Sequence, residues 1–272
     1  MTPIGVVVPT CDRPELLSRA LESVTRQSRA PTEVIVVDNG LTAVPASVKA
    51  RFPIATFIRL APRCGVSVAR NQGALTATTP WIAFLDDDDR WPEDYLATMV
   101  AAAEAGTLDM VAALIRVGDG GEVRRPVPPD QPGVVPAWRQ NGYGGSNLLV
   151  RRAAFWTVGG FAARLTTGED RALFIEFVLH ELRVGVCEAT CCYASVHSGE
   201  RLTDNAALLR GKLDFLFTYG DRMARRPARE DRFACLVYLS RAWGFPFWLA
   251  GLVAYPEVAW RRLIRWLRGG RS

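Results

Sequence analysis

The chain has 272 residues, of which 49% are hydrophobic and 22% are charged. This length and balance exclude a disordered chain and a small disulfide scaffold, and they allow one large α/β domain with or without an appended segment. The net charge of +5 is uneven: residues 222–272 hold eleven arginines and three acids, whereas residues 1–221 hold 22 basic and 25 acidic side chains.

The first forty residues read as a strand, a helix and a second strand. "IGVVVPT" (4–10) is the β-branched run of a buried strand, and "RPELLSRALESVTRQ" (13–27) has apolar residues at helical spacing. "EVIVVDNG" (33–40) is another apolar run that stops at polar residues. Continuous apolar strands joined by a helix predict a parallel sheet that is covered on both faces.

The alternation continues along the chain. "ATFIRLA" (55–61) and "WIAFLD" (81–86) predict further strands, with a helix "GVSVARNQGALTA" (65–77) between them. "WPEDYLATMVAAAEAG" (91–106) predicts a helix, and "LDMVAALIRVG" (108–118) predicts a strand. We therefore predict an α/β fold whose sheet is mostly parallel and flanked by helices.

Residues 118–145 lack periodicity and are rich in turn residues, which predicts a long surface excursion. Order returns with "SNLLVRRAAFWTVGGF" (146–161). "GEDRALFIEFVLHEL" (168–182) predicts a helix with Glu169 and Asp170 in its opening turn.

Four consecutive aspartates, Asp86 to Asp89, follow a predicted strand in "FLDDDDRWPEDYL" (84–96). Adjacent carboxylates repel one another unless a positive charge lies among them. One interpretation is a site for Mg²⁺ or Mn²⁺, which prefer oxygen ligands. The other is a solvated turn in which Asp89 caps the next helix.

Polar residues also stand at other predicted strand ends. "PTCDR" (9–13) closes the first strand, Asp38 closes the second, and Arg70 and Asn71 precede the fourth. Ligands of parallel α/β sheets bind at the carboxyl edge of the strands. We therefore expect one cleft, where Arg70 faces a diphosphate and Asp38 accepts a hydrogen bond from a base or ribose.

Five motifs occur in the order and approximate spacing of one known family. They are "VVVPTCDRPELLSRALESVTRQ", "VIVVDNG", "GVSVARNQG", "FLDDDDRWPEDYL" and "GEDRALF". With them the chain resembles glycosyltransferase family 2 over roughly residues 3–205. The resemblance implies the GT-A fold, a nucleotide-diphosphate-sugar-binding α/β domain. We expect this catalytic domain to span residues 1–205 and a helical extension to span 206–272.

The resemblance also implies roles for single residues. Asp38 would lie near the base and Arg70 near the diphosphate, while Asp86 and Asp88 are similar to the Asp-x-Asp pair of the family. The register of that pair stays open by one residue, and Asp88 is the better metal ligand. The expected nucleotide-sugar contacts are Pro9, Thr10, Asp12, Arg13, Asp38, Arg70, Asn71, Asp86 and Asp87.

Asp170 is similar to the carboxylate that serves as general base in inverting members, and Glu169 is the second candidate. The alternative role of Asp170 is a favourable interaction with the helix dipole. His197 is similar to a histidine that completes the metal shell or meets the diphosphate, and a structural role is the alternative. The expected cofactor is Mn²⁺ or Mg²⁺, which would neutralise the leaving diphosphate.

The donor base is less specified than the fold. Relatives often read "Thr-Tyr-Asn-Arg" where this chain has "Thr-Cys-Asp-Arg", so an aromatic contact from position 11 to the base is missing. We expect a UDP-sugar, with this departure counting against strict uridine specificity.

The six cysteines form no regular framework, and Cys187, Cys191, Cys192 and His197 do not match a zinc-site spacing. We expect them to be buried small side chains in a reducing cytoplasm. The first residues lack the basic start of a signal peptide, which agrees with that location.

The arginine-rich C-terminal region predicts a membrane-surface helix. The apolar stretch 242–256 has fifteen residues and a proline, too short to span a bilayer. "WRRLIRWLR" (260–268) places apolar side chains on one face and arginines on the other, which suits an anionic membrane surface. The alternatives are packing on the catalytic domain or a homodimer contact, and we expect no nucleic-acid binding.

We therefore predict a metal-dependent, inverting glycosyltransferase that is peripheral to the inner face of the cell membrane. Its acceptor would be a glycan or a lipid-linked saccharide in cell-envelope polysaccharide synthesis. The alternatives are a soluble small-molecule acceptor and a catalytically silent sugar-nucleotide-binding or scaffold protein. Asp86, Asp88 and Asp170 argue against silence.

Overall fold

The computed structural model describes ten ranges of the chain: 2–118, 120–129, 133, 142–195, 205–219, 221, 229, 232–237, 239–240 and 248–260. The chain divides into two compact units. The first contains Met1–Val134, Gln140–Ala163 and Glu169–His197, and the second contains Val135–Arg139, Arg164–Gly168 and Ser198–Ser272. The expected boundary between a catalytic domain 1–205 and an extension 206–272 stays a prediction.

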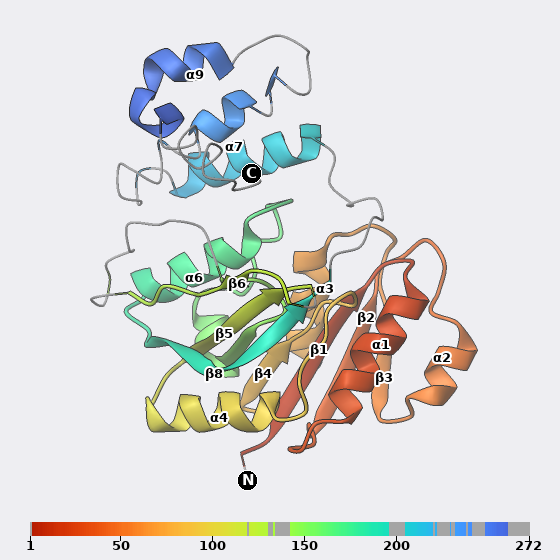
Figure 1. Cartoon of the computed structure of the whole chain (residues 1–272). Helices are drawn as coiled ribbons and strands as arrows, with labels where there is room; N and C mark the ends of the chain where they lie inside the picture. The colour runs from red at the N-terminus through yellow and green to blue at the C-terminus, as the bar shows by residue number, and fades with distance from the viewer. Residues whose placement is uncertain are drawn as a thin grey trace. The chain divides into compact units, whose positions relative to one another are not determined.

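A mixed sheet forms the centre of the first unit (Figure 1). Among the described residues its strands are β1 (Ile4–Thr10), β2 (Glu33–Asp38), β3 (Ala55–Arg59), β4 (Trp81–Phe84), β5 (Met110–Val117), β6 (Val123–Arg124), β7 (Leu148–Arg151) and β8 (Val184–Ala194). Their order is β3-β2-β1-β4-β7-β5-β6, with β8 paired to β5. The pairs among β1 to β4 are parallel, as is the β5–β8 pair, whereas β7 and β6 run antiparallel to their neighbours.

Helices flank this sheet (Figure 1). The helices of the first unit are α1 (Pro14–Thr25), α2 (Ala46–Arg51), α3 (Val66–Thr76), α4 (Tyr95–Ala105), α5 (Arg152–Thr157) and α6 (Glu169–Leu179). The apolar sides of α1 and α4, including Leu17, Leu21 and Met99, share one core cluster with alternate residues of β1, β2 and β4. Both helices therefore cover the same face of the sheet, and the predicted α/β fold is confirmed.

The described part of the second unit contains the helices α7 (Asn205–Tyr219) and α9 (Trp248–Ala254). Within these described ranges no helix combines the length and the apolar character needed to cross a membrane. Of the expected tail helix 260–268 the structure describes Trp260 only, and the rest lies outside the described residues.

One predicted helix start is wrong. The fourth helix begins at Tyr95 and not at Trp91. Arg90 forms a β-bridge with Tyr193 of β8, and a turn closed by the hydrogen bond from the Tyr95 amide to the Pro92 carbonyl at 3.1 Å precedes the helix. The Trp91 ring stacks on the Tyr95 ring at 4.4 Å. Asp89 does not cap this helix, because its carboxylate is hydrogen-bonded elsewhere.

Four of the six cysteines are buried as expected, whereas Cys64 and Cys191 are partly exposed. Cys187, Cys191 and Cys192 lie on β8 beside Ala113, Leu114 and Ile115 of β5, and all six cysteines are free thiols. Within the described ranges only Asp86, Asp88 and Asp89 form a group that could hold a metal ion. His197 lies outside the described residues.

Candidate active site

Two strand ends meet through Asp87, the second residue of the acidic run. Asp87 is fully buried, and its carboxylate accepts hydrogen bonds from Thr10 Oγ1 at 2.7 Å and from Arg13 Nη2 at 2.5 Å. Burial raises the pKa of Asp87 to about 6, although the Arg13 guanidinium and the Thr10 hydroxyl act in the opposite direction. As the structure stands, Asp87 positions Thr10 and Arg13 and offers no open oxygen to a ligand.

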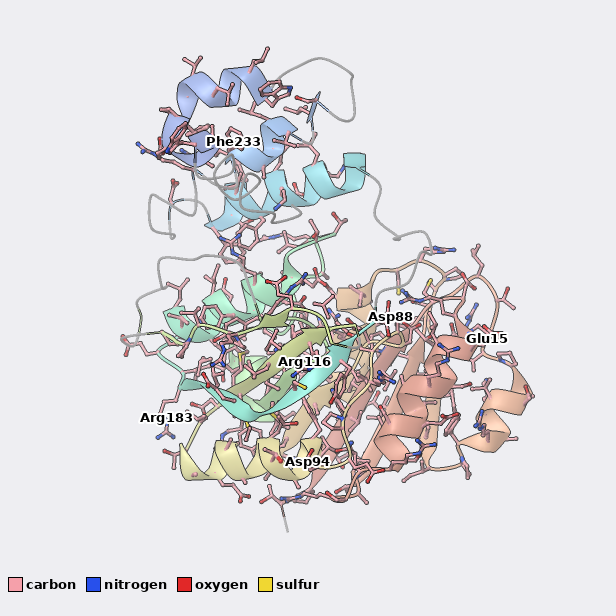
Figure 2. All side chains as sticks on the ribbon, viewed as in Figure 1. Glu15, Asp88, Asp94, Arg116, Arg183 and Phe233 are labelled. Atoms are coloured by element: carbon pink, nitrogen blue, oxygen red, sulfur yellow. The ribbon has the colours of Figure 1, made fainter. Side chains whose placement is uncertain are left out.

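Asp86, Asp88 and Asp89 gather beside it. One carboxylate oxygen from each lies within 4.8 Å of the others. The Asp86 and Asp88 side chains remain 27% and 22% exposed, and Arg13 Nη1 donates to Asp88 at 2.8 Å. Figure 2 shows Asp88 toward the carboxyl ends of the parallel strands, with Asp94 at the opposite edge. Three hard oxygen donors at this spacing fit a divalent cation.

Asp89 is held more deeply than Asp86 or Asp88. Its two oxygens accept hydrogen bonds from Ser146 Oγ at 2.5 Å and from the Ser195 amide at 3.0 Å. Burial raises the pKa of Asp89 to about 7, and the Asp86 charge adds to the shift. The run therefore alternates, with Asp87 and Asp89 turned into the protein and Asp86 and Asp88 reaching solvent.

Arg70 of α3 links this run to the start of α6. The side chain is almost fully buried, and its guanidinium donates to Asp86 at 2.6 Å, to Glu169 at 3.1 Å and to Asp170 at 3.3 Å. The guanidinium also lies 5.0 Å from the Phe161 ring centroid. Arg70 therefore brings together the two acidic motifs that the sequence analysis singled out, which we call the acidic cluster: Asp86, Asp88, Asp89, Glu169 and Asp170.

The surroundings of Asp170 make its carboxylate a strong proton acceptor. Burial raises the pKa of Asp170 well above its usual range, the adjacent Glu169 raises it further, and Arg70 opposes both. The Gly145 amide donates a hydrogen bond to Asp170. A Cβ at Gly145 would overlap the Arg70 guanidinium, so only glycine lets the backbone approach this closely.

A cavity of about 220 Å³ lies at the ends of β1 and β2. Its lining includes Thr10, Asp12, Arg13 and Asp38, four of the expected nucleotide contacts. Asp38 accepts from the Gly40 and Val44 amides, both at 2.9 Å, and so shapes the loop that forms one wall.

Charged partners fix the acids of this cavity. Asp38 pairs with Arg59 at 2.6 Å, and Asp12 pairs with Arg63 at 3.1 Å. Asp12 has a positive φ of 58°, and the amides of the same loop donate to its carboxylate, which lowers its pKa. The cavity is therefore preformed on a hydrogen-bonded loop.

Two expected contacts lie apart from the acidic cluster. The Asn71 side chain donates to the Phe161 carbonyl at 2.8 Å and accepts from the Phe161 amide at 2.9 Å, so both ends of its amide are used in the scaffold. Pro9 is a buried residue of β1 beside Val37. In this structure both residues make contacts within the scaffold of the site.

Sequence reasoning did not predict that Ser146 and Trp91 contact the acidic run and each other. Ser146 Oγ donates to Asp89 and accepts from the Asp86 amide at 3.0 Å, while Trp91 Nε1 donates to the Ser146 carbonyl at 2.7 Å. The glycines before Ser146 mark a turn, but only the antiparallel placement of β7 beside β4 shows where that turn lies. Ser146 therefore contacts both the first and the last residue of the acidic run, and Trp91 holds Ser146 in place.

The comparisons with known proteins identify the family of the chain. Residues 5–161, more than half of the chain, match the family model described as "Glycosyl transferase family 2". The chain belongs to glycosyl transferase family 2. Its resemblance to this family, which rests on five motifs, is thereby confirmed.

Curated relatives of the family match over part of their length. An uncharacterized glycosyltransferase of Haemophilus influenzae is 28% identical over 61% of this chain and 59% of its own. A GalNAc(5)-diNAcBac-PP-undecaprenol beta-1,3-glucosyltransferase of Campylobacter jejuni is 30% identical over 39% of this chain and 36% of its own. The chain thus spans less than two thirds of the length of these relatives.

Solved structures confirm the GT-A fold. S. aureus TarS 1-349 in complex with UDP is 18% identical with a TM-score of 0.62, over 90% of this chain and 72% of that one. The mannosyltransferase PcManGT of Pyrobaculum calidifontis, in complex with GDP-Man and Mn²⁺, is 18% identical with a TM-score of 0.63, over 94% and 76%. At these identities the likeness concerns the fold alone.

Proposed function

We propose that this protein is a metal-dependent, inverting glycosyltransferase that moves a sugar from a nucleotide-diphosphate sugar to a hydroxyl of a glycan or lipid-linked acceptor. The observation that carries the proposal is the Arg70 guanidinium, which joins Asp86 of the acidic run to Asp170 at the start of α6. The carboxylate that would hold the cation of the leaving diphosphate and the carboxylate that would take a proton are thereby fixed on one side chain.

The donor would bind across two neighbouring features. The cavity beside Asp38 has room for part of a nucleoside, and Thr10 and Arg13 connect it to the acidic run. Asp86 and Asp88, the more exposed carboxylates, would hold the divalent cation, which supports the register Asp86-x-Asp88. When bound, the cation supplies charge neutralisation for the leaving nucleoside diphosphate. The complexes of TarS with UDP and PcManGT with GDP-Man and Mn²⁺ support this class of ligand.

Asp170 would act on the acceptor. The acceptor oxygen attacks the anomeric carbon, the bond from that carbon to the diphosphate oxygen breaks, and the acceptor proton passes to the Asp170 carboxylate. Attack from the face opposite the leaving group inverts the anomeric centre, so an α-linked donor gives a β-linked product. Arg70 and the Gly145 amide would hold the Asp170 carboxylate in place during this transfer.

The acceptor class draws support from a relative. The Campylobacter jejuni match is named as a glucosyltransferase acting with an undecaprenol-linked saccharide. A UDP-sugar is the donor we propose, and a lipid-linked or envelope glycan is the acceptor.

Calorimetric titration of UDP, GDP and dTDP with and without Mn²⁺ tests the donor site. We expect binding to need Mn²⁺ and to be lost in Asp88→Ala. The matched control is Asp94→Ala, since Asp94 is exposed and makes no side-chain capping bond at α4. Nucleotide binding that ignores both Mn²⁺ and Asp88 would leave the acidic run as a solvated turn and would remove the mechanism.

The second unit would place the enzyme on a membrane. The side chains of Phe217, Val253 and Trp260 are 96%, 84% and 62% exposed, and residues 222–272 carry an excess of eight positive charges. Apolar side chains with arginines favour an anionic lipid surface. We expect sedimentation with phosphatidylglycerol vesicles but not with phosphatidylcholine vesicles, and weaker sedimentation of Val253→Ser/Trp260→Ser. Concentration-dependent dimerisation without vesicle binding would favour the homodimer contact instead.

A further inference from the structure

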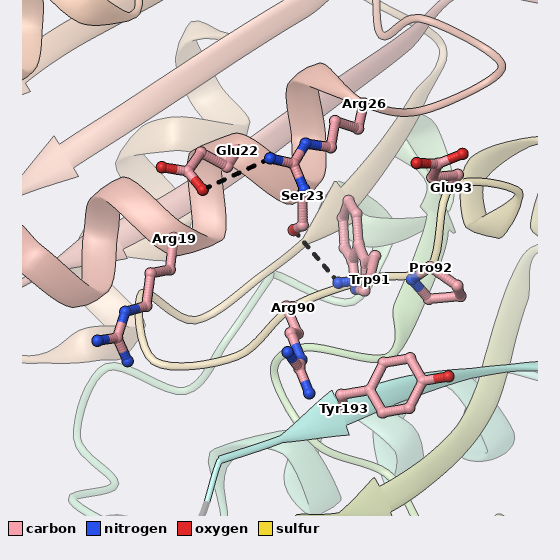
Figure 3. Close-up of a pocket in the computed structure, with 9 residues that line it drawn as sticks. All are labelled: Arg19, Glu22, Ser23, Arg26, Arg90, Trp91, Pro92, Glu93 and Tyr193. Carbon is pink, nitrogen blue, oxygen red and sulfur yellow. Dashed lines mark hydrogen bonds and ion pairs between the residues drawn. The ribbon is translucent and has the colours of Figure 1, made fainter. Parts of the chain in front are cut away.

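A second polar cavity, of about 540 Å³, lies on the face of the sheet that α1 covers (Figure 3). We call it the arginine pocket. Its walls come from one side of α1, from the segment after the acidic run and from the end of β8: Arg19, Glu22, Ser23, Arg26, Arg90, Trp91, Pro92, Glu93 and Tyr193. None of these residues belongs to the acidic cluster or to the Asp38 cavity, so the pocket is a separate feature.

The charges of the pocket leave Arg19 as an exposed cation. The lining contains three arginines and two glutamates. Glu22 forms ion pairs with Arg51 at 2.6 Å and with Arg26 at 4.0 Å. Arg19 is exposed, and no carboxylate of the described residues pairs with it. Figure 3 shows the Arg19 and Arg90 side chains extending the same way, apart from the Glu22–Arg26 pair. An anion entering at this end would meet the exposed Arg19 guanidinium.

The walls of the pocket are rigid and partly aromatic. Arg90 and Tyr193 exchange two backbone hydrogen bonds of 3.2 and 2.9 Å, and the Arg90 guanidinium lies 5.3 Å from the Tyr193 ring centroid. The Trp91 amide donates to Ser23 Oγ at 3.2 Å, which ties this segment to α1. Because the segment is fixed at both ends, the pocket exists before any ligand binds, which lowers the entropic cost of binding.

We propose that the arginine pocket binds a carboxylate-bearing sugar unit of a glycan. Guanidinium groups recognise carboxylates through paired N–H donors, and the Tyr193 ring offers apolar surface to the C–H face of a pyranose. Arg90 directly follows Asp89, and the Ser195 amide that binds Asp89 is two residues from Tyr193. The pocket is therefore connected to the acidic cluster through the Asp89–Arg90 peptide bond. The role of the bound glycan as acceptor rests on the proposed function, whereas the binding itself does not.

Calorimetric titration with trigalacturonate tests the binding, with maltotriose as the uncharged probe of equal length and inorganic phosphate as the free anion. We expect trigalacturonate to bind wild type at least tenfold more tightly than maltotriose or phosphate. Arg19→Ala/Arg90→Ala should weaken trigalacturonate binding at least tenfold. Lys49→Ala/Arg124→Ala is the matched control, because it removes the same charge at two exposed positions outside the pocket and should change binding less than twofold.

Each other outcome overturns the proposal. Equal weakening in both double variants would mean a general charge effect, and unchanged binding in Arg19→Ala/Arg90→Ala would place the ligand elsewhere. If phosphate binds as tightly as trigalacturonate, the pocket recognises an anion and not a sugar. If trigalacturonate does not bind wild type, the pocket is not a site for an acidic glycan. UDP titration with Mn²⁺ on the same samples tests the donor site independently of trigalacturonate binding, and circular dichroism tests folding, so failure of the proposed function is distinguishable from failure of this one.

Discussion

The acidic cluster and the arginine pocket meet at a single peptide bond, between Asp89 and Arg90, and they treat charge in opposite ways. In the cluster, Arg70 is buried and donates to Asp86, Glu169 and Asp170. In the pocket, Arg19 is exposed and pairs with no carboxylate of the described residues. Buried charges that bind one another fix geometry, whereas exposed charges remain available to a ligand. The same arginine chemistry therefore serves as scaffold in one region and as recognition surface in the other.

The largest expected effect is on the rate of sugar transfer, and it tests the role of the acidic cluster. Asp170→Asn keeps the shape of the side chain but removes the proton acceptor, so we expect sugar transfer to fall by about 10²- to 10⁴-fold. UDP binding with Mn²⁺ should change little, because Asp86 and Asp88 remain. Initial rates measured together with UDP titration separate the two quantities. Asp94→Asn is the control, and a fully active Asp170→Asn would transfer the base role to Glu169.

Stability provides the next test. Arg70→Met keeps the length of the side chain but leaves three acids without their shared cation, and we expect the free energy of unfolding to fall by about 3–5 kcal/mol. Arg19→Met removes an exposed arginine and should lie within about 0.5 kcal/mol of wild type. Urea denaturation followed by circular dichroism measures both. Comparable losses in the two variants would contradict the division between a scaffold arginine and a recognition arginine.

Most of the first unit could be predicted from sequence, because its signals are local. The apolar runs of β1, β2 and β4 and the helical spacing of α1 each lie within one short segment. Strand ends of a parallel sheet share an edge, so the strand pattern alone predicts that Asp38 and the acidic run lie near each other. What this reasoning does not give is the partner of each side chain.

The contacts that the sequence did not predict join distant segments. Arg70 is 99 residues from Glu169, and Ser146 is 57 residues from Asp89, so no periodicity connects them. The same holds for the wrong helix start at Trp91, where the bridge to Tyr193 of β8 overrides local helix propensity. Buried polar pairs of this kind follow from topology, in particular from β7 inserted antiparallel between β4 and β5.

The smallest predicted effect concerns Ser146. Ser146→Ala removes the hydroxyl that donates to Asp89 and accepts from the Asp86 amide, and we expect a loss of about 1–2 kcal/mol in unfolding free energy. The affinity for Mn²⁺ in the presence of UDP should also fall, by roughly tenfold if the loosened run costs about 1.4 kcal/mol on binding.

Ser195→Ala is the matched control for Ser146→Ala, since Ser195 contacts Asp89 through its backbone amide, which the substitution keeps. Calorimetric Mn²⁺ titrations of both variants make the comparison direct. If Ser146→Ala lowers stability but leaves Mn²⁺ affinity unchanged, Ser146 supports the fold alone. If the Mn²⁺ affinity of Ser146→Ala falls while Ser195→Ala behaves as wild type, the hydrogen bond from Ser146 to Asp89 sets the spacing of Asp86 and Asp88. The inward-facing members of the acidic run would then control what the outward-facing members can bind.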